Sequence, residues 1–186
     1  MTGPTARGHR MEERRRRILE AARGRAEADG WSAVTTRHLA DAIGYTQPVL
    51  YGHFPGGKAE IMLTLAMEGF AELVEWCRAA LGAAEAESAA EVVAVAYLDF
   101  GSAHPAVYEA MFQQVIAAKF AADDTPPELR EAFDLLSMSI GDTDGGAATE
   151  VFWGALHGIS LLERAGRMRP EHRASRVAEL SARFGR

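Results

Sequence analysis

The sequence predicts an all-α protein in which a small three-helix N-terminal domain is joined by a long helix to a larger helical bundle. Three observations support this prediction: apolar residues recur at helical spacing, no stretch alternates as a β-strand would, and glycine or proline separates the helical stretches. The 186 residues are 48% hydrophobic, which is ample for a buried core. We place the boundary between the two domains after Lys58, which gives domains of residues 1–58 and 59–186.

The first helix is expected from about Arg10 to Asp29. Residues 1–9 contain two glycines and a proline and are expected to form an arm. Gly30 ends the helix, because only glycine adopts a left-handed backbone without steric cost, and Trp31 packs beyond that end.

Residues 35–58 predict a helix-turn-helix. Its first helix begins at Thr35 and Thr36, where a hydroxyl oxygen can accept hydrogen bonds from unpaired N–H groups, and it ends at Gly44. Its second helix begins at Thr46, with Pro48 in the first turn, where the missing N–H does no harm.

The outward side of the second helix suits the major groove of DNA. Leu50 and Phe54 lie four residues apart and face inward, which turns Gln47, Val49, Gly52 and His53 outward, with Tyr51 beside them. A glutamine amide can pair with an adenine edge, and a valine can touch a thymine methyl group. Tyr51, His53 and Lys58 are placed to reach phosphates. The alternative is an ordinary helical hairpin in which Tyr51 and Phe54 only pack.

Charge is distributed unevenly along the chain, whose net charge is −6. Residues 1–60 hold ten Lys and Arg against seven Asp and Glu, a net of +3, whereas the remaining residues hold ten against nineteen, a net of −9. The basic excess therefore lies where phosphates would bind, and binding should depend strongly on salt. The run Arg14 to Arg17 is either a solvated helix face or a phosphate contact, and we expect at least one of these arginines to touch DNA.

Residues 35–58 resemble the DNA-binding domain of the TetR family of bacterial transcriptional regulators. The residues that carry the resemblance are Thr36, Leu39, Ala40, Gly44, Pro48, Leu50, Tyr51, His53, Phe54 and Lys58. One departure is the turn at residues 54–58, FPGGK, which is one residue longer than the form common in the family. The predicted DNA-contacting set is Arg14, Arg17, Thr36, Arg37, Thr46, Gln47, Pro48, Val49, Tyr51, His53 and Lys58.

The rest of the chain is expected to form a connecting helix followed by five further helices. Helical periodicity and the intervening breakers place them at residues 59–81, 89–103, 106–120, 128–140, 147–165 and 171–184. Ser88 and Glu91 have the spacing of a capping box, and His104-Pro105 forces a new start because the residue before proline avoids the helical region.

The bundle also resembles one class of TetR C-terminal domain, the WHG type, at Trp153, His157 and Gly158 and at residues 96–112. The resemblance implies a homodimer formed through the last two long helices, and a small-molecule pocket between the others. Gly154 and Gly158 are four apart, which would let a partner helix approach closely. The predicted dimer contacts are Phe152, Gly154, Gly158, Leu162, Val177, Leu180 and Phe184.

Aromatic and apolar residues of the bundle are candidates for a ligand pocket. They are Phe70, Tyr97, Phe100, Tyr108, Met111, Phe112, Trp153 and His157. The alternative for each is that it fills the core, as large apolar residues usually do. His157 is then a hydrogen-bonded structural histidine rather than a ligand contact.

Several classes of protein are excluded or disfavoured. Cys77 is the single cysteine, so neither an intrachain disulfide nor a cysteine-based zinc site can form. The histidines show no metal-ligand spacing, and no nucleophile elbow or phosphate-binding loop occurs, which disfavours an enzyme; we expect no metal and no cofactor. No apolar run spans a membrane and no signal peptide precedes the first helix, so we expect a cytoplasmic protein.

The sequence thus predicts a sequence-specific, DNA-binding transcriptional regulator. We expect a homodimeric repressor that binds double-stranded operator DNA and is released by a small-molecule effector. A helical scaffold that binds a protein partner through its acidic surface is the remaining alternative. The sequence names neither the operator, the regulated genes nor the ligand, and a repressor and an activator would look alike.

Overall fold

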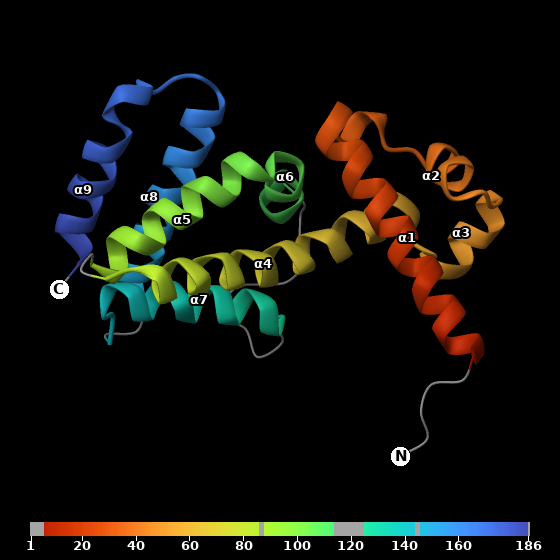
Figure 1. The fold of residues 1–186 in the computed structure, drawn as a ribbon, viewed down its shortest axis with the longest axis horizontal. Coiled ribbons are helices and arrows are strands. Elements are labelled where there is room, and N and C mark those ends of the chain that lie inside the picture. Colours follow the sequence, from red (N-terminus) through yellow and green to blue (C-terminus); the bar gives the residue numbers. More distant parts are fainter. Residues whose placement is uncertain (1–5, 86–87, 114–124, 144–145, 186) are drawn as a thin grey trace, which may run out of the picture. The chain divides into compact units, whose positions relative to one another are not determined.

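The computed structural model describes residues 6–85, 88–113, 125–143 and 146–185, and these residues form helices and connecting turns without a strand. The predicted all-α fold is confirmed (Figure 1). In chain order the helices are α1 (Ala6–Asp29), α2 (Thr36–Ile43), α3 (Gln47–His53), α4 (Gly57–Ala83), α5 (Ala89–Ala103), α6 (Pro105–Gln113), α7 (Pro127–Ile140), α8 (Ala147–Arg164) and α9 (Arg173–Phe184). Short 3₁₀ turns occur at Trp31–Ala33 and Pro170–His172.

The described residues pack into two compact units. One, here called the N-terminal unit, contains the chain up to Met67 together with α6. The other, here called the body, contains residues 68–104 and the described residues from Thr125 onward. Helix α6 therefore packs with the N-terminal helices, although it lies in the sequence range predicted for the bundle. The division of the chain into functional domains at Lys58 stays a prediction.

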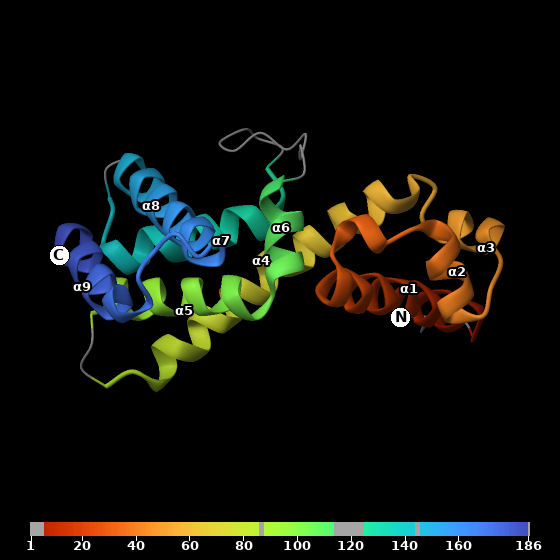
Figure 2. The same cartoon turned by 90° about the horizontal axis from the view of Figure 1, so that it is seen from above.

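In the N-terminal unit, α1, α2 and α3 pack against one another (Figure 2). The residues buried there are the apolar ones that the sequence pattern predicts. Leu50 and Phe54 are fully buried, as their inward-facing spacing predicts. Thr35 precedes α2, and its side-chain oxygen accepts a hydrogen bond from the N–H of His38 at 3.2 Å. Gly44 ends α2 with a left-handed backbone, φ 73°, so both predicted helix boundaries are confirmed.

In the body, α5 packs against α7, α8 and α9. Its inward residues Val93, Tyr97 and Phe100 are completely buried, and Ser88 accepts a hydrogen bond from the Glu91 N–H at 3.2 Å, as the capping-box spacing predicts. Burial raises the pKa of the Cys77 thiol of α4 to about 12, so this side chain is a protonated part of the core at neutral pH.

Helix ends differ from the sequence prediction at several places. Helix α1 begins at Ala6 rather than at about Arg10, so residues 6–9 are helical and do not belong to the expected arm. Helix α4 begins at Gly57 rather than Ala59, because the Glu60 carboxylate reaches back and accepts a hydrogen bond from the Gly56 N–H at 2.8 Å. Before α9, residues 170–172 form a 3₁₀ turn rather than the first turn of the helix. The predicted extension of α6 to Phe120 lies outside the described residues. Of the helices described, none is both long and apolar enough to cross a membrane.

Candidate functional site

Helix α3 exposes its polar side to solvent and buries its apolar side in the core of the N-terminal unit. Thr46, Gln47 and Pro48 are exposed, and Val49 and His53 are partly exposed. Tyr51 is 45% exposed, a high value for an aromatic side chain. The structure therefore brings the predicted base-reading residues together on one accessible face.

Two predicted contact residues, Tyr51 of α3 and Thr36 of α2, meet at Gly57, where α4 begins. The ring of Tyr51 lies over Gly57, since a Cβ atom added to Gly57 would be 3.3 Å from Tyr51 Cε1 and 3.8 Å from Thr36 Cγ2. Gly57 also has a left-handed backbone, φ 60°. Any side chain at this position would thus have a strained backbone, and the Tyr51 ring would have to shift by a few tenths of an ångström. The length of the FPGGK turn is visible in the sequence, but this requirement at Gly57 is not.

A single arginine that the sequence analysis did not select fixes the end of α3. Arg15 of α1 donates hydrogen bonds to the His53 carbonyl oxygen at 3.1 Å and to Thr64 Oγ1 of α4 at 3.3 Å. Its guanidinium carbon also lies 4.2 Å from the centre of the Phe54 ring, a cation–π geometry. Arg15 therefore joins α1 to the C-terminal end of α3 and to α4.

The other arginines of the run have different neighbours. Arg14 and Arg17 lie beside the ring of Tyr45, at 5.1 and 6.0 Å from its centre, and Arg17 donates to the Ile43 carbonyl oxygen at 3.2 Å. Arg16 pairs with Glu13 and Glu20 on the exposed surface of α1. The predicted phosphate contacts Arg14 and Arg17 thus pack against the turn between α2 and α3, which places them next to the α3 face.

Lys58 has a structural partner of its own. Its ammonium group donates to the Trp31 carbonyl oxygen, which ties the start of α4 to the 3₁₀ turn after α1. Two N–H donors of an ammonium remain after one such bond. Arg37, in the first turn of α2, is exposed.

Helix α6 is anchored by two hydrogen bonds to α1 and by one to the 3₁₀ turn that follows it. The carboxylate of Glu27 accepts from the N–H groups of Ala106 and Val107 at 3.0 and 3.1 Å. Trp31, which is 5% exposed, donates from its indole N–H to the Ala106 carbonyl oxygen at 2.7 Å. A carboxylate at a helix N-terminus satisfies unpaired N–H groups and interacts favourably with the helix dipole.

Comparison with known proteins decides what this arrangement is. The family model described as "Bacterial regulatory proteins, tetR family" matches residues 18–65, and that described as "Tetracyclin repressor-like, C-terminal domain" matches residues 90–184. The second match alone covers just over half of the 186 residues. The chain belongs to the TetR family. It is therefore a DNA-binding transcriptional regulator and not an enzyme, as the sequence predicts.

Individual relatives agree with this assignment. An HTH-type transcriptional regulator of Mycobacterium tuberculosis is 24% identical over 157 residues, which is 83% of this chain and 72% of that protein. A protein of unknown function from Rhodococcus sp. RHA1 has the same fold, with a TM-score of 0.75, 24% identity and 92% of each chain covered. The regulator RolR, solved with resorcinol, gives a TM-score of 0.66 at 16% identity, with 95% of this chain and 90% of RolR covered.

The body of this TetR-family chain contains a small interior cavity. Its lining residues come from α4, α5, α7 and α8 and are Phe70, Leu73, Tyr97, Leu129, Ala132, Phe133, Leu136 and Trp153. The indole N–H of Trp153 donates to the Tyr97 hydroxyl oxygen at 3.1 Å. The cavity volume of about 10 Å³ admits one water molecule at most.

The predicted ligand residues do not all line this cavity. Phe70, Tyr97 and Trp153 do, whereas Phe100 packs against Trp76 and His104, at 6.0 and 5.0 Å between ring centres. Of the eight predicted residues, this cavity therefore brings together three, and a ligand role for the others stays a prediction. Tyr108, Met111 and Phe112 lie on α6 in the N-terminal unit.

His157 also lies outside the lining of the cavity. It is partly buried in α8, and burial together with the positive charge of Arg164 lowers its pKa below the ordinary value. The neutral imidazole is therefore favoured at pH 7, which agrees with the structural role considered for it.

The residues predicted to form a dimer interface fall into two groups. Phe152, Val177 and Leu180 are buried inside the body, and Phe152 packs on Phe184 with 5.4 Å between ring centres. These three side chains thus pack within the protomer, and their part in a dimer interface stays a prediction. The accessible members are Gly154 and Leu162 of α8, which are exposed, and Gly158 of α8 and Phe184 of α9, which are partly exposed.

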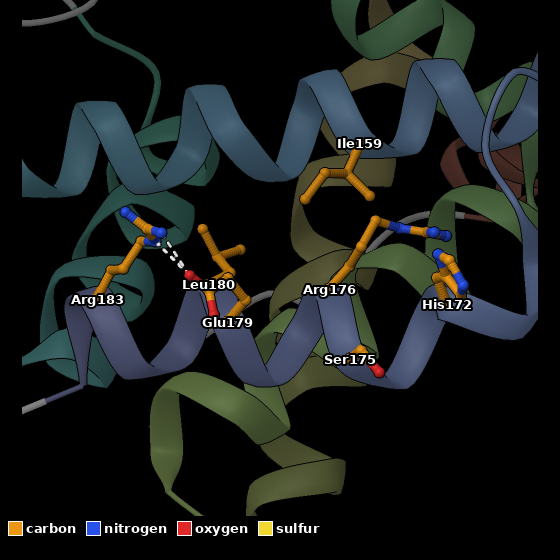
Figure 3. A pocket seen from close by; sticks show the side chains of 7 residues that line it. All are labelled: Ile159, His172, Ser175, Arg176, Glu179, Leu180 and Arg183. Atoms are coloured by element: carbon orange, nitrogen blue, oxygen red, sulfur yellow. Dashed lines mark hydrogen bonds and ion pairs between the residues drawn. The ribbon is translucent and has the colours of Figure 1, made fainter.

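Beside this face, an open groove of about 580 Å³ runs between α8 and α9 (Figure 3). Ile159 of α8 points across it toward Leu180 and Arg176 of α9, and the His172 ring lies near the end of Arg176. Arg176 pairs with Glu163 of α8 at 2.5 Å, which holds the two helices together along the groove. Among the described residues, no cluster of three or more His, Cys, Asp or Glu side chains is arranged to hold a metal ion.

Proposed function

We propose that this TetR-family regulator is a cytoplasmic repressor that binds operator DNA through α3 and leaves it when a small molecule binds the body. The observation that supports it best is the accessible polar face of α3. Gln47 is exposed while Leu50 and Phe54, on the opposite side, are completely buried. A recognition helix needs this division, because its inner face must be held firmly while its outer face enters the major groove.

In this proposal, some α3 side chains contact base edges and others contact the DNA backbone. Gln47 and Val49 face base edges, where they can pair with adenine and touch a thymine methyl group. Tyr51, placed over Gly57, contacts the DNA backbone, together with residues of α1, α2 and the start of α4. The complete proposed set is Arg14, Arg17, Thr36, Arg37, Thr46, Gln47, Pro48, Val49, Tyr51, His53 and Lys58.

Substitutions at Arg37 and Gln47 test which residues contact the backbone and which contact bases, because both side chains are exposed on the N-terminal unit. Arg37→Ala should lower affinity for every duplex to a similar degree and reduce the slope of log affinity against log salt by about one. Gln47→Ala should instead relax the preference at one base pair, by about 1–3 kcal/mol.

Binding of duplexes selected from random sequence, measured over a series of salt concentrations, separates the two effects. A sequence-selective loss for Arg37→Ala, or a uniform loss for Gln47→Ala, would contradict the assignment. Lys58→Ala is a poorer probe of phosphate contact, because it also removes the bond to the Trp31 carbonyl oxygen.

We also propose that the protein acts as a homodimer through α8. Val151 and Leu161 add two large exposed apolar side chains, 61% and 43% exposed, to the face that carries Gly154, Gly158 and Leu162. These positions recur every three or four residues, so they form one stripe along the helix. Two copies related by a two-fold axis would bury this stripe and present two α3 helices to major grooves about 34–36 Å apart.

A charge in the α8 stripe should prevent this association. Val151→Arg is expected to shift the mass measured by light scattering at micromolar concentration toward that of a monomer and to weaken operator binding. Met138→Arg on α7 is the matched control, because Met138 is an even more exposed apolar residue, 82%, outside the stripe. Equal effects of the two substitutions, or a monomeric wild-type protein, would exclude this interface.

The effector site of the proposal is the cavity of the body. RolR, a protein of the same fold, was solved with the small molecule resorcinol, which supports a small-molecule effector in this architecture. Ligand and operator binding must then be reciprocally coupled. An effector that binds equally well to free and DNA-bound protein would refute release by ligand.

A further inference from the structure

We infer that the interior cavity of the body accepts a small uncharged aromatic molecule that carries one hydrogen-bonding oxygen, and that it rejects carboxylates of the same shape. This inference rests on the proposed function and specifies the chemical class of the effector. Three features of the cavity support it: its lining carries no charged side chain, Trp153 and Tyr97 form one hydrogen-bonded pair in it, and the Phe133 ring can move to enlarge it.

The lining contains no ionisable side chain other than a tyrosine. Its remaining members are aliphatic or aromatic, such as Phe70, Leu73 and Leu129, all nearly or completely buried. A carboxylate moved from water into such a site loses its hydration and gains no cationic partner. The lining therefore discriminates strongly between a neutral ligand and an anion.

The polar groups of the cavity are the Trp153 indole N–H and the Tyr97 hydroxyl, which bond to each other at 3.1 Å. An indole N–H only donates, whereas a phenol hydroxyl both donates and accepts. A ligand oxygen inserted between them can accept from the indole and exchange a hydrogen bond with the hydroxyl. The site can thus satisfy one ligand oxygen without leaving either protein group unpaired.

The cavity must enlarge before it can hold a ring, because its volume is only about 10 Å³. Phe133 of α7 and Trp153 of α8 are the two lining side chains that are only partly buried, and because Trp153 supplies the hydrogen bond, we assign the movement to Phe133. Its ring lies against Gly146: a Cβ atom there would be 3.1 Å from Phe133 Cζ. Displacing this ring frees space for about one aromatic ring, comparable to the cavity of about 150 Å³ that binds benzene in another protein.

The test uses p-cresol, which is neutral at pH 7, and 4-methylbenzoate, which has the same ring and methyl group but is charged. Binding to the full-length wild-type protein is measured by calorimetry and by the fluorescence of Trp153, with Trp153→Phe as the control for the signal. We expect p-cresol to bind and 4-methylbenzoate to bind at least about tenfold more weakly. Equal or tighter binding of 4-methylbenzoate, or no binding of p-cresol at millimolar concentration, would overturn the inference.

Tyr97→Phe tests the hydrogen bond, with toluene as the matched probe that lacks oxygen. The substitution should weaken p-cresol binding about three- to tenfold and leave toluene binding unchanged, because it removes a hydroxyl and keeps the ring. Equal changes for both probes would show that Tyr97 acts only through packing, which contradicts the proposed oxygen site.

Phe133→Ala tests the moving ring. This variant should bind p-cresol about tenfold more tightly than the wild type, because the space no longer has to be opened. Unchanged affinity would show that the ligand does not replace this ring.

Failure of the effector role has a separate signature. Operator binding is measured with and without p-cresol in the same preparations. Binding of p-cresol without any change in operator affinity would retain the ligand class and reject release by ligand at this cavity. Release of the operator by 4-methylbenzoate instead would retain the proposed function and reject the ligand class.

Discussion

Replacing Arg15 by alanine should destabilise the N-terminal unit by about 2–4 kcal/mol. The substitution removes two hydrogen bonds from a charged donor, each worth about 1.5 kcal/mol where partly buried, and a cation–π contact worth about 0.5–1 kcal/mol. It also leaves the His53 carbonyl oxygen without the Arg15 bond at the end of α3. Since α3 has only seven residues, its position depends on such tertiary contacts more than on its own helix stability.

Arg16→Ala is the control for this prediction, because it makes the same change one residue away. Arg16 pairs only with Glu13 and Glu20 on the exposed surface, so its removal should leave stability nearly unchanged. Urea unfolding followed by circular dichroism gives the stability of both variants, and duplex binding at fixed salt gives the consequence for DNA. A similar loss of stability for the two variants would show that Arg15 does not position α3.

The orientation of Arg15 illustrates what the sequence could have revealed. Arg15 lies three and four residues before the buried Ile18 and Leu19, so helical spacing alone places it on the inward face of α1. A run of four arginines obscures that signal, because charge clusters are usually read as one solvated face. The structure shows the difference between neighbours, since Arg15 bonds to α3 and α4 whereas Arg16 pairs with Glu13 on the surface.

Local signals determine the helix-turn-helix, which is why its boundaries were predictable. A threonine cap, a left-handed glycine and a proline in the first turn each act within a few residues, and Thr35, Gly44 and Pro48 occupy those places. The role of Gly57 was not predictable in this way. It depends on the ring of Tyr51, which reaches Gly57 only after the turn has folded.

Contacts between residues distant in sequence, in contrast, could not be predicted from the sequence pattern. An amphipathic helix shows which face is apolar but not whether the protomer or a second copy covers it. Phe152, Val177 and Leu180 therefore fitted a dimer interface equally well until their burial in the protomer was known. The same limit applies to α6, whose apolar residues fitted a ligand pocket in the sequence and pack in the N-terminal unit in the structure.

Replacing Glu27 by alanine should release the N-terminal end of α6 from α1, at a cost of about 2–3 kcal/mol. The carboxylate accepts hydrogen bonds from two backbone N–H groups, those of Ala106 and Val107, which are left without this acceptor. Hydrogen exchange of these two amides should accelerate, because their protection depends on the side chain of another helix. Glu20→Ala on the outer surface of α1 is the control and should leave their exchange unchanged.

Glu27→Gln separates the charge from the shape of this anchor. A glutamine side chain can accept from one of the two N–H groups, but its NH₂ group would face the other, and its neutral amide loses the favourable interaction with the helix dipole. The loss of stability should therefore be smaller than for Glu27→Ala yet clearly measurable, and exchange of one of the two amides should accelerate more than that of the other. If Glu27→Gln has the stability and the amide exchange of the wild type, the charge of Glu27 contributes nothing to holding α6. If neither substitution accelerates exchange at Ala106 and Val107, the bond of Trp31 to the Ala106 carbonyl oxygen is sufficient to hold α6.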